Sequence, residues 1–375
     1  MSKQHELVQF SRGATGGGSK NLLINGGFQI FQRASAATTV STGQYQTADR
    51  WRLYESTDGS YTTERSTDTP SGTGYSLKAV VTTADTSIAA TQYASIEQYI
   101  EAQNCQHLAY GTSGAKALTL SFYVKSSKTG IYTITLYKPD TTGYIYTKEY
   151  TINAANTWEK KEITITPTAG STSFITSSGG AIANDNGIGL ALGFNLAWGS
   201  NFSGGTSDVW SATIANYSTT NAVNWMDTVG NTFLIAEAQL EVNDTSTDFE
   251  FENYATTLAK CQRYFYNFQP AGTVNSGGNE VGIVGSNYNG NNFFGSIYFP
   301  VTMRATPALS SGGDWASRDG NNNLLTSVFS YQRSSPRMVL VSATATNVTG
   351  GNALWVEPSS GTSPNTAFMD FDAEL

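Results

Sequence analysis

The feature that most constrains this chain is a period-two alternation of apolar and polar residues, repeated at short intervals. In residues 118–124 (LTLSFYV), the first, third, fifth and seventh positions are apolar and share one face of an extended strand. Comparable runs follow at 131–138, 144–152, 158–166 and 188–198, separated by turn residues. Short strands without intervening amphipathic helices are typical of antiparallel β-sandwiches. The pattern therefore predicts an all-β chain.

Three details of strand arrangement also follow from the pattern. The turn at 128–130 (KTG) predicts that the strands before and after it pair as a hairpin. The run 188–198 is more continuously apolar, and we expect it to be a central strand. In residues 233–242, alternation predicts one face with Leu, Ala, Ala, Leu and Val, and an opposite face with Glu237, Gln239 and Glu241.

The chain is long enough for more than one domain, because 375 residues exceed the usual single-domain size. Residues 253–263 break the strand rhythm, since apolar positions recur at helical spacing after Asn253, a suitable N-cap. The predicted fold is two antiparallel β-sandwich, jelly-roll-like domains joined by a short helix, with a flexible N-terminal arm. The expected boundaries are 1–20 for the arm, 21–248 for the first sandwich, 249–265 for the helical connector and 266–375 for the second sandwich.

Charged residues make up 13% of the chain and the net charge is −8. Nucleic-acid binding is disfavoured because no cluster of Lys and Arg forms a basic surface. No apolar run approaches the length of a membrane-spanning helix, so we expect no membrane insertion. Residues 1–20 lack the apolar core of a signal peptide. We therefore expect synthesis in a cytoplasm, without export by the secretory route.

Few residues suit catalysis or metal binding. The two histidines are His5 and His107, and neither lies in a pattern that predicts a catalytic triad or a zinc site. Paired carboxylates for glycoside cleavage would draw on Asp49, Asp227 and Glu237, which lie closest to apolar strands. Turn and strand-face roles explain these carboxylates more simply, so we expect no catalytic residues, no cofactor and no metal.

The two cysteines lie far apart in the sequence. Cys105 and Cys261 can in principle pair, but a cytosolic chain without a signal peptide favours free thiols. Cysteine without a partner is also one of the most buried residue types. We therefore expect both cysteines to be free and buried.

Several segments, in order along the chain, resemble a widespread family of bacteriophage virion proteins. The resemblance rests on 21–28 (NLLINGGF), 47–51 (TADRW), 118–130 (LTLSFYVKSSKTG), 238–242 (AQLEV), 258–265 (LAKCQRYF), 300–307 (PVTMRATP) and 371–375 (FDAEL). It implies a tail-fibre, receptor-binding or head-decoration protein whose first domain resembles carbohydrate-binding modules. It also implies a homotrimer on the virion. Such modules often bind calcium through a carboxylate after the opening motif, but Gln29 stands there, so no calcium site is inferred.

Glycan binding is the function for which the residues offer candidates, since aromatic rings stack on sugar rings. Trp198, Trp210, Tyr217 and Trp225 lie in a Gly-, Ser- and Asn-rich region, and we take them as the candidate glycan-binding residues. Trp210 and Trp225 are expected in loops. The alternative is that these rings fill one end of a core or a subunit contact.

Two kinds of protein partner are expected. The polar, glycine-rich residues 1–20 have no core of their own and are predicted to dock against other virion proteins. Phe293, Phe294, Tyr298 and Phe329 form either a trimer contact or an ordinary domain core. The competing functions are a free glycan-binding module and, less favoured, a polysaccharide-cleaving enzyme.

Overall fold

The fold is known from a computed structural model that describes residues 20–268, 282–287, 292–313, 315–318, 322–324, 329–344, 353–358 and 367–375. These residues form four antiparallel sheets and the helix α2 (Tyr254–Gln262), so the predicted all-β class is confirmed. The predicted arm at 1–20, Lys20 apart, lies outside the described residues. None of the described helices has the length and apolar character needed to cross a membrane.

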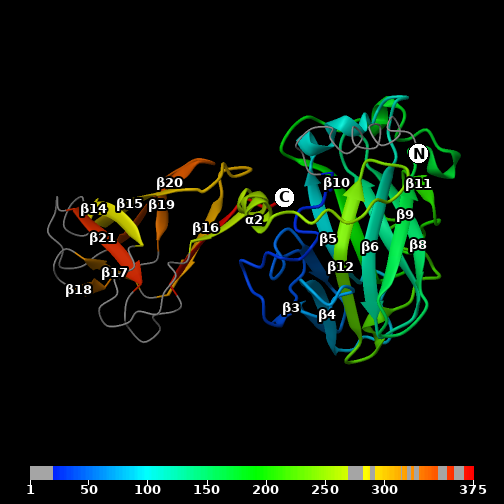
Figure 1. The fold of residues 1–375 in the computed structure, drawn as a ribbon, viewed down its shortest axis with the longest axis horizontal. Coiled ribbons are helices and arrows are strands. Elements are labelled where there is room, and N and C mark those ends of the chain that lie inside the picture. The colour runs from blue at the N-terminus through cyan, green and yellow to red at the C-terminus, as the bar shows by residue number, and fades with distance from the viewer. Residues whose placement is uncertain are drawn as a thin grey trace, which may run out of the picture.

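Two six-stranded sheets form the first sandwich (Figure 1). Sheet A consists, in spatial order, of β1 (Thr38–Thr39), β3 (Ser60–Ser66), β4 (Ser76–Thr83), β12 (Thr232–Glu241), β6 (Leu118–Ser126) and β9 (Glu159–Ile165). Sheet B consists of β11 (Val209–Ser211), β8 (Tyr144–Ile152), β7 (Gly130–Lys138), β10 (Ile188–Trp198), β5 (Tyr93–Glu101) and β2 (Arg52–Glu55). Since β10 lies between β7 and β5, the prediction of a central strand at 188–198 is confirmed.

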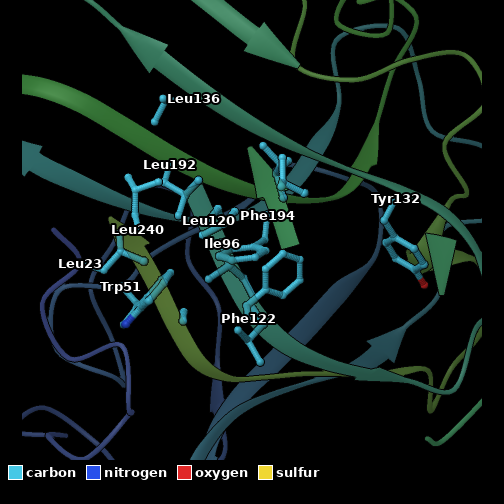
Figure 2. Close-up of a cluster of buried hydrophobic side chains, with 14 of the residues drawn as sticks. Leu23, Trp51, Ile96, Leu120, Phe122, Tyr132, Leu136, Leu192, Phe194 and Leu240 are labelled. Carbon is cyan, nitrogen blue, oxygen red and sulfur yellow. The ribbon is translucent and has the colours of Figure 1, made fainter. Parts of the chain in front are cut away.

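The inner faces of sheets A and B enclose one continuous apolar core. Phe122 of β6 meets Phe194 of β10 edge-to-face, with ring centroids 4.9 Å apart, and Trp51 packs on the same Phe194 ring (Figure 2). Full burial of each such ring is worth roughly 1.5–3 kcal/mol before conformational entropy is subtracted. This cross-sheet contact holds the position of β10, which also carries residues of the outer face.

The predicted hairpin across residues 128–130 is wrong. β6 pairs with β12 and β9 in sheet A, whereas β7 pairs with β10 and β8 in sheet B, so the chain crosses between the sheets. Gly130 lies at the crossing with φ of 127°, and Val223 Cγ1 is 2.5 Å from where a Cβ would stand. Turn residues signal a change of direction, but they do not specify which strand becomes the partner.

The predicted strand faces at 233–242 are wrong in the first half of β12. Phe233 and Ile235 join the core there, whereas Ala238 and Leu240 join it in the second half. The register between β12 and β6 shifts between Ala236 and Gln239, and Glu237 has a φ of 50°. A β-bulge therefore inserts one residue and exchanges the two faces of the strand.

The residues after α2 form two further sheets around a second apolar core. Sheet C consists of β13 (Phe265–Phe268), β22 (Phe368–Asp372) and β16 (Ala308–Gly312). Sheet D consists of β18 (Asn322–Leu324), β17 (Trp315–Arg318), β21 (Ala353–Pro358), β14 (Ile283–Asn287), β15 (Asn292–Tyr298), β20 (Met338–Thr344) and β19 (Ser330–Ser334). Phe293 and Phe329 are buried in this core, while Tyr298 is exposed, so the four aromatics do not form one surface patch.

The helix α2 begins after Asn253, whose side chain accepts a hydrogen bond from the Ala255 amide, as the N-cap prediction requires. Figure 1 shows α2 and the C-terminus between the two sandwiches. Cys105, in the 3₁₀ segment η1 (Ala102–Leu108), and Cys261, in α2, are both free and buried, which confirms that prediction. The exact domain boundaries stay a prediction.

A buried polar contact joins the C-terminal residues to the first sandwich. The carboxylate of Glu374 bonds to the guanidinium of Arg50, and it lies 3.3 Å from that of Arg33. The Arg50 guanidinium also stacks on the Tyr264 ring, 3.6 Å from its centroid. From the first sandwich, Glu101 accepts two hydrogen bonds from Arg263 at 2.6 and 3.0 Å. Charge pairs thus connect the two apolar cores.

Candidate functional site

The side of sheet B that faces away from the core, called here the outer face, carries aromatic and polar residues. The β-strand alternation puts Tyr93, Ser95, Glu97 and Tyr99 of β5 on this face, because Ala94 and Ile96 are in the core. Cross-strand register places Gly193 of β10 opposite Glu97. The absence of a side chain at Gly193 leaves open space in the middle of the sheet.

That space is a pocket of about 100 Å³, called here the Glu97 pocket. It is lined by Glu97, Tyr99, Thr135, Tyr137, Pro139, Ile188, Ala191, Gly193 and Tyr217. Three strands and the segment after β10 thus contribute to one hollow, and three of its walls are tyrosines. A Cβ at position 193 would stand 2.8 Å from Thr135 Oγ1 and 3.5 Å from Glu97 Cγ, so a larger residue there would fill the space.

Glu97 is the ionisable group of this pocket. Its carboxylate accepts a hydrogen bond of 2.9 Å from Ser95 Oγ. Arg52 stands opposite Glu97 in the register of β2 and β5, but its Nε donates to the Gly43 carbonyl and its guanidinium lies over the Tyr54 and Tyr99 rings. Burial raises the pKa of Glu97 to about 7, and the charge of Arg52 opposes that shift. The carboxyl therefore changes charge near neutral pH.

Trp198, at the end of β10, lies in the middle of an aromatic stack. Its ring is 5.0 Å from that of Tyr93 and 4.6 Å from that of Tyr217, with interplanar angles of 13° and 3°. Phe202 meets both Trp198 and Tyr217 edge-on. Both faces of Trp198 are therefore covered, and a sugar cannot stack on them. Tyr217 stacks on Trp198 and also lines the Glu97 pocket.

A second hollow, of about 410 Å³, lies at the C-terminal end of β10 and is called here the Trp198 groove. Its lining is mostly small and polar: Thr86, Ile88, Asn195, Leu196, Ala197, Trp198, Ser200, Ser203, Gly204, Ser218, Thr219, Thr220, Ala222, Val223 and Asn224. Two buried atoms of these residues, Trp198 Nε1 and Asn195 Oδ1, lack a hydrogen-bond partner among the described residues. One is a donor and the other an acceptor, which a hydroxyl-rich ligand or water can satisfy.

Two of the four candidates from the sequence do not belong to this face. Trp210 is in β11 rather than a loop, is 1% exposed, and donates from Nε1 to the Thr166 carbonyl. Trp225 opens the 3₁₀ segment η4 (Trp225–Asp227), is 0% exposed, and packs against Tyr61 and Phe233. Both rings fill the sandwich core, as the alternative reading of the sequence expects. The assignment of Trp210 and Trp225 as sugar-stacking residues is therefore corrected.

Several residues of the site were missed by sequence reasoning. Glu97, Tyr99 and Tyr93 alternate along β5, and Tyr137 lies in a run that was recognised as a strand. The signal was therefore present as a period-two row of tyrosines and one carboxylate. It was overlooked because tyrosine in a strand is ordinary, whereas tryptophan in a Gly- and Ser-rich region is uncommon.

The other ionisable candidates lie outside the Glu97 pocket, and two of them have structural partners. Asp49 is buried and accepts a hydrogen bond of 2.9 Å from the Gln32 amide. Asp227 bonds to Lys128, and Glu237 lies in the bulge of β12. Partial burial and the charge of Lys116 lower the pKa of His107, the opposite of what a carboxylate partner would do. Within the described part of the chain, no three His, Cys, Asp or Glu side chains gather as a metal site would require.

No protein-family model matches the chain, and no curated protein sequence does. Among solved structures, a putative sugar-binding protein from Bacteroides thetaiotaomicron is similar over 60% of this chain and 100% of its own, at 13% identity and a TM-score of 0.34. The family 11 carbohydrate-binding module of a Clostridium thermocellum cellulase is similar over 56% of this chain and 96% of its own, at 13% identity and a TM-score of 0.28.

The enzymatically active domain of tailspike protein 4 from bacteriophage CBA120 is similar over 60% of this chain, at 13% identity and a TM-score of 0.30. The matched part spans 22% of that tailspike chain. At such identities and TM-scores, these likenesses carry no inference about ligand, activity or location.

Proposed function

We propose that this protein binds glycans on the outer face of sheet B, and that it does so as a trimer on the exterior of a phage particle, in contact with the host cell surface. The observation that carries the glycan-binding part is the Glu97 pocket, with its three tyrosine walls and a carboxyl at its side. Sugar sites combine apolar ring faces with a few polar groups that fix orientation. The Trp198 groove, whose lining includes Ser218 next to Tyr217 of the pocket, supports an extended ligand rather than a single ring.

The first test is binding of the full chain to a glycan array, compared with Tyr217→Ala. Tyr217 lines the pocket and is held by its stack on Trp198. Loss of such an aromatic anchor costs more than about 1.4 kcal/mol, so we expect at least about a tenfold loss of affinity. Tyr298→Ala is the matched control, because Tyr298 is an exposed tyrosine of sheet D. Unchanged binding by Tyr217→Ala contradicts the proposed site.

The virion part of the proposal is supported by the ordered sequence resemblance and by the polar residues 1–20, which are suited to docking on another protein. Its test is a phage in which the gene encodes the chain without residues 1–20. We expect a trimer that folds but is missing from purified particles, as measured by mass spectrometry of the particles. Normal incorporation of the truncated chain contradicts an attachment role for this segment.

The two rival functions give different results in the same experiments. A free glycan-binding module would bind the array but would be absent from particles carrying the intact gene. A polysaccharide-cleaving enzyme would shorten the bound oligosaccharide during incubation, which chromatography of the products detects. We expect binding without shortened products.

A further inference from the structure

We infer that the Glu97 pocket receives an ammonium group carried by the glycan, so that the site selects sugars with a free amine over neutral or acidic ones. This inference rests on the proposed glycan-binding function and specifies its ligand class. It comes from the combination of tyrosine rings and a carboxylate in one small hollow. Aromatic rings attract cations through their negative faces, and cages of such rings are a known way of holding alkylammonium groups.

The rings come from three separate parts of the chain. Tyr99 is in β5, Tyr137 is in β7, and Tyr217 is in the loop after β11. Tyr217 is fixed in place because Trp198 stacks on its ring, with centroids 4.6 Å apart. Tyr99 is fixed by a hydrogen bond of 2.6 Å between its hydroxyl and that of Tyr54. Two of the three walls are therefore set before a ligand arrives, which lowers the entropy cost of binding.

The carboxylate supplies the charge that a purely aromatic cage lacks. Glu97 accepts a hydrogen bond from Ser95 Oγ, and in the part of the chain that the structure describes no Lys or Arg nitrogen lies within 4 Å of it. A carboxylate accepts several hydrogen bonds, so Glu97 has capacity left for an N–H donor. An ammonium group meets this need with both charge and hydrogen bonds.

Arg52 is the cation that could compete for Glu97, since the two residues stand opposite each other on β2 and β5. Its guanidinium instead lies 5.1 Å from the centroids of both the Tyr54 and Tyr99 rings, and its Nε donates to the Gly43 carbonyl at 2.9 Å. Arg52 also does not line the pocket. The space beside Glu97 is thus left for a cation from outside, and an acidic sugar would meet an unfavourable like charge.

An ammonium on a glycan has two common chemical sources, an amino sugar or an ethanolamine substituent. The experiment measures affinity by calorimetry at pH 7.0, where part of the amines and part of the Glu97 carboxyl are charged. The ligands are a β-1,4-linked glucosamine tetramer, its fully N-acetylated counterpart, and ethanolamine alone. The proteins are the full chain, Glu97→Gln and Glu162→Gln. Gln keeps the size of Glu97 and removes its charge. Glu162 is the matched control, because it is an exposed carboxylate of β9 in sheet A, where it pairs with Lys160 away from both hollows.

We expect the full chain and Glu162→Gln to bind the glucosamine tetramer at least about tenfold more tightly than the acetylated tetramer, and Glu97→Gln to lose that preference. Strong competition by ethanolamine supports a substituent as the source, and weak competition supports an amino sugar. Equal binding of the two tetramers by the full chain overturns the inference, as does a preference that survives in Glu97→Gln. If only neutral glycans bind, the inference of an ammonium ligand is wrong, but the proposed glycan-binding function is supported. If no glycan binds here or on the array, both fall.

Discussion

Single residues decide what the outer face of sheet B can bind. Trp198 was the most conspicuous candidate in the sequence, yet Tyr93 and Tyr217 cover both of its faces. It stacks on Tyr217, which lines the Glu97 pocket. An aromatic side chain can thus contribute to a site through packing, and sequence alone does not separate this role from direct contact.

The charge of Glu97 gives a pH prediction at the same scale. Because burial raises the pKa of this carboxyl to about 7, it is mostly protonated at pH 6 and mostly ionised at pH 8. Affinity for a cation should therefore increase with pH, by roughly tenfold between these values. Tetramethylammonium is the suitable probe, since its own charge does not titrate. Affinity is measured by NMR titration of the full chain.

The charged and titratable groups around Glu97 determine whether a change of affinity with pH can be assigned to this carboxyl. Arg52 faces it from β2, Tyr99 from β5, Tyr137 from β7 and Tyr217 from the segment after β10. Burial raises the pKa of Tyr99 to about 12, so this tyrosine stays neutral between pH 6 and 8. Arg52 stays charged throughout. An increase in affinity that persists in Glu97→Gln would show that another group is responsible.

At the scale of elements, the sequence predicted the existence of strands better than their partners. Alternation located β6, β7, β8, β9 and β10 to within a few residues because side chains must point alternately into the core. It did not reveal that β6 and β7 belong to different sheets, because partner choice depends on residues distant in sequence. The bulge at Glu237 was also invisible, since a single non-glycine residue with positive φ leaves no compositional trace.

The candidate site could be predicted only in part, because it depends on strand partners that the sequence does not reveal. The Glu97 pocket needs the order β7-β10-β5, which brings Tyr137, Gly193 and Glu97 together from strands far apart in the chain. The sequence identified Tyr217 and Trp198 by their unusual context, but it could not show that Trp210 and Trp225 point into the core. Their burial follows from sandwich closure, a property of both sheets together.

At the scale of the whole molecule, buried charges join the second sandwich to the first. Arg50 and Glu374 are 1% and 5% exposed at their side chains, so removing one partner leaves an uncompensated buried charge. We expect Glu374→Gln to lower the free energy of unfolding by about 3 kcal/mol or more. Denaturant unfolding monitored by tryptophan fluorescence measures this change.

Glu64→Gln provides the control for that experiment. Glu64 pairs with Lys78 at 2.7 Å on the surface of sheet A, where both side chains are about 30% exposed. Exposed pairs contribute at most about 1 kcal/mol. Equal losses in the two variants would mean that the junction charges do not hold the sandwiches together.

The central claim is that a glycan occupies the outer face of sheet B. The most direct measurement is a crystal structure of the full chain with the oligosaccharide that binds best on the array. The account predicts a sugar ring against Tyr217, with one polar substituent in hydrogen-bond contact with Glu97 and the rest of the chain in the Trp198 groove. A sugar bound to another surface, with the Glu97 pocket filled only by water, would contradict it.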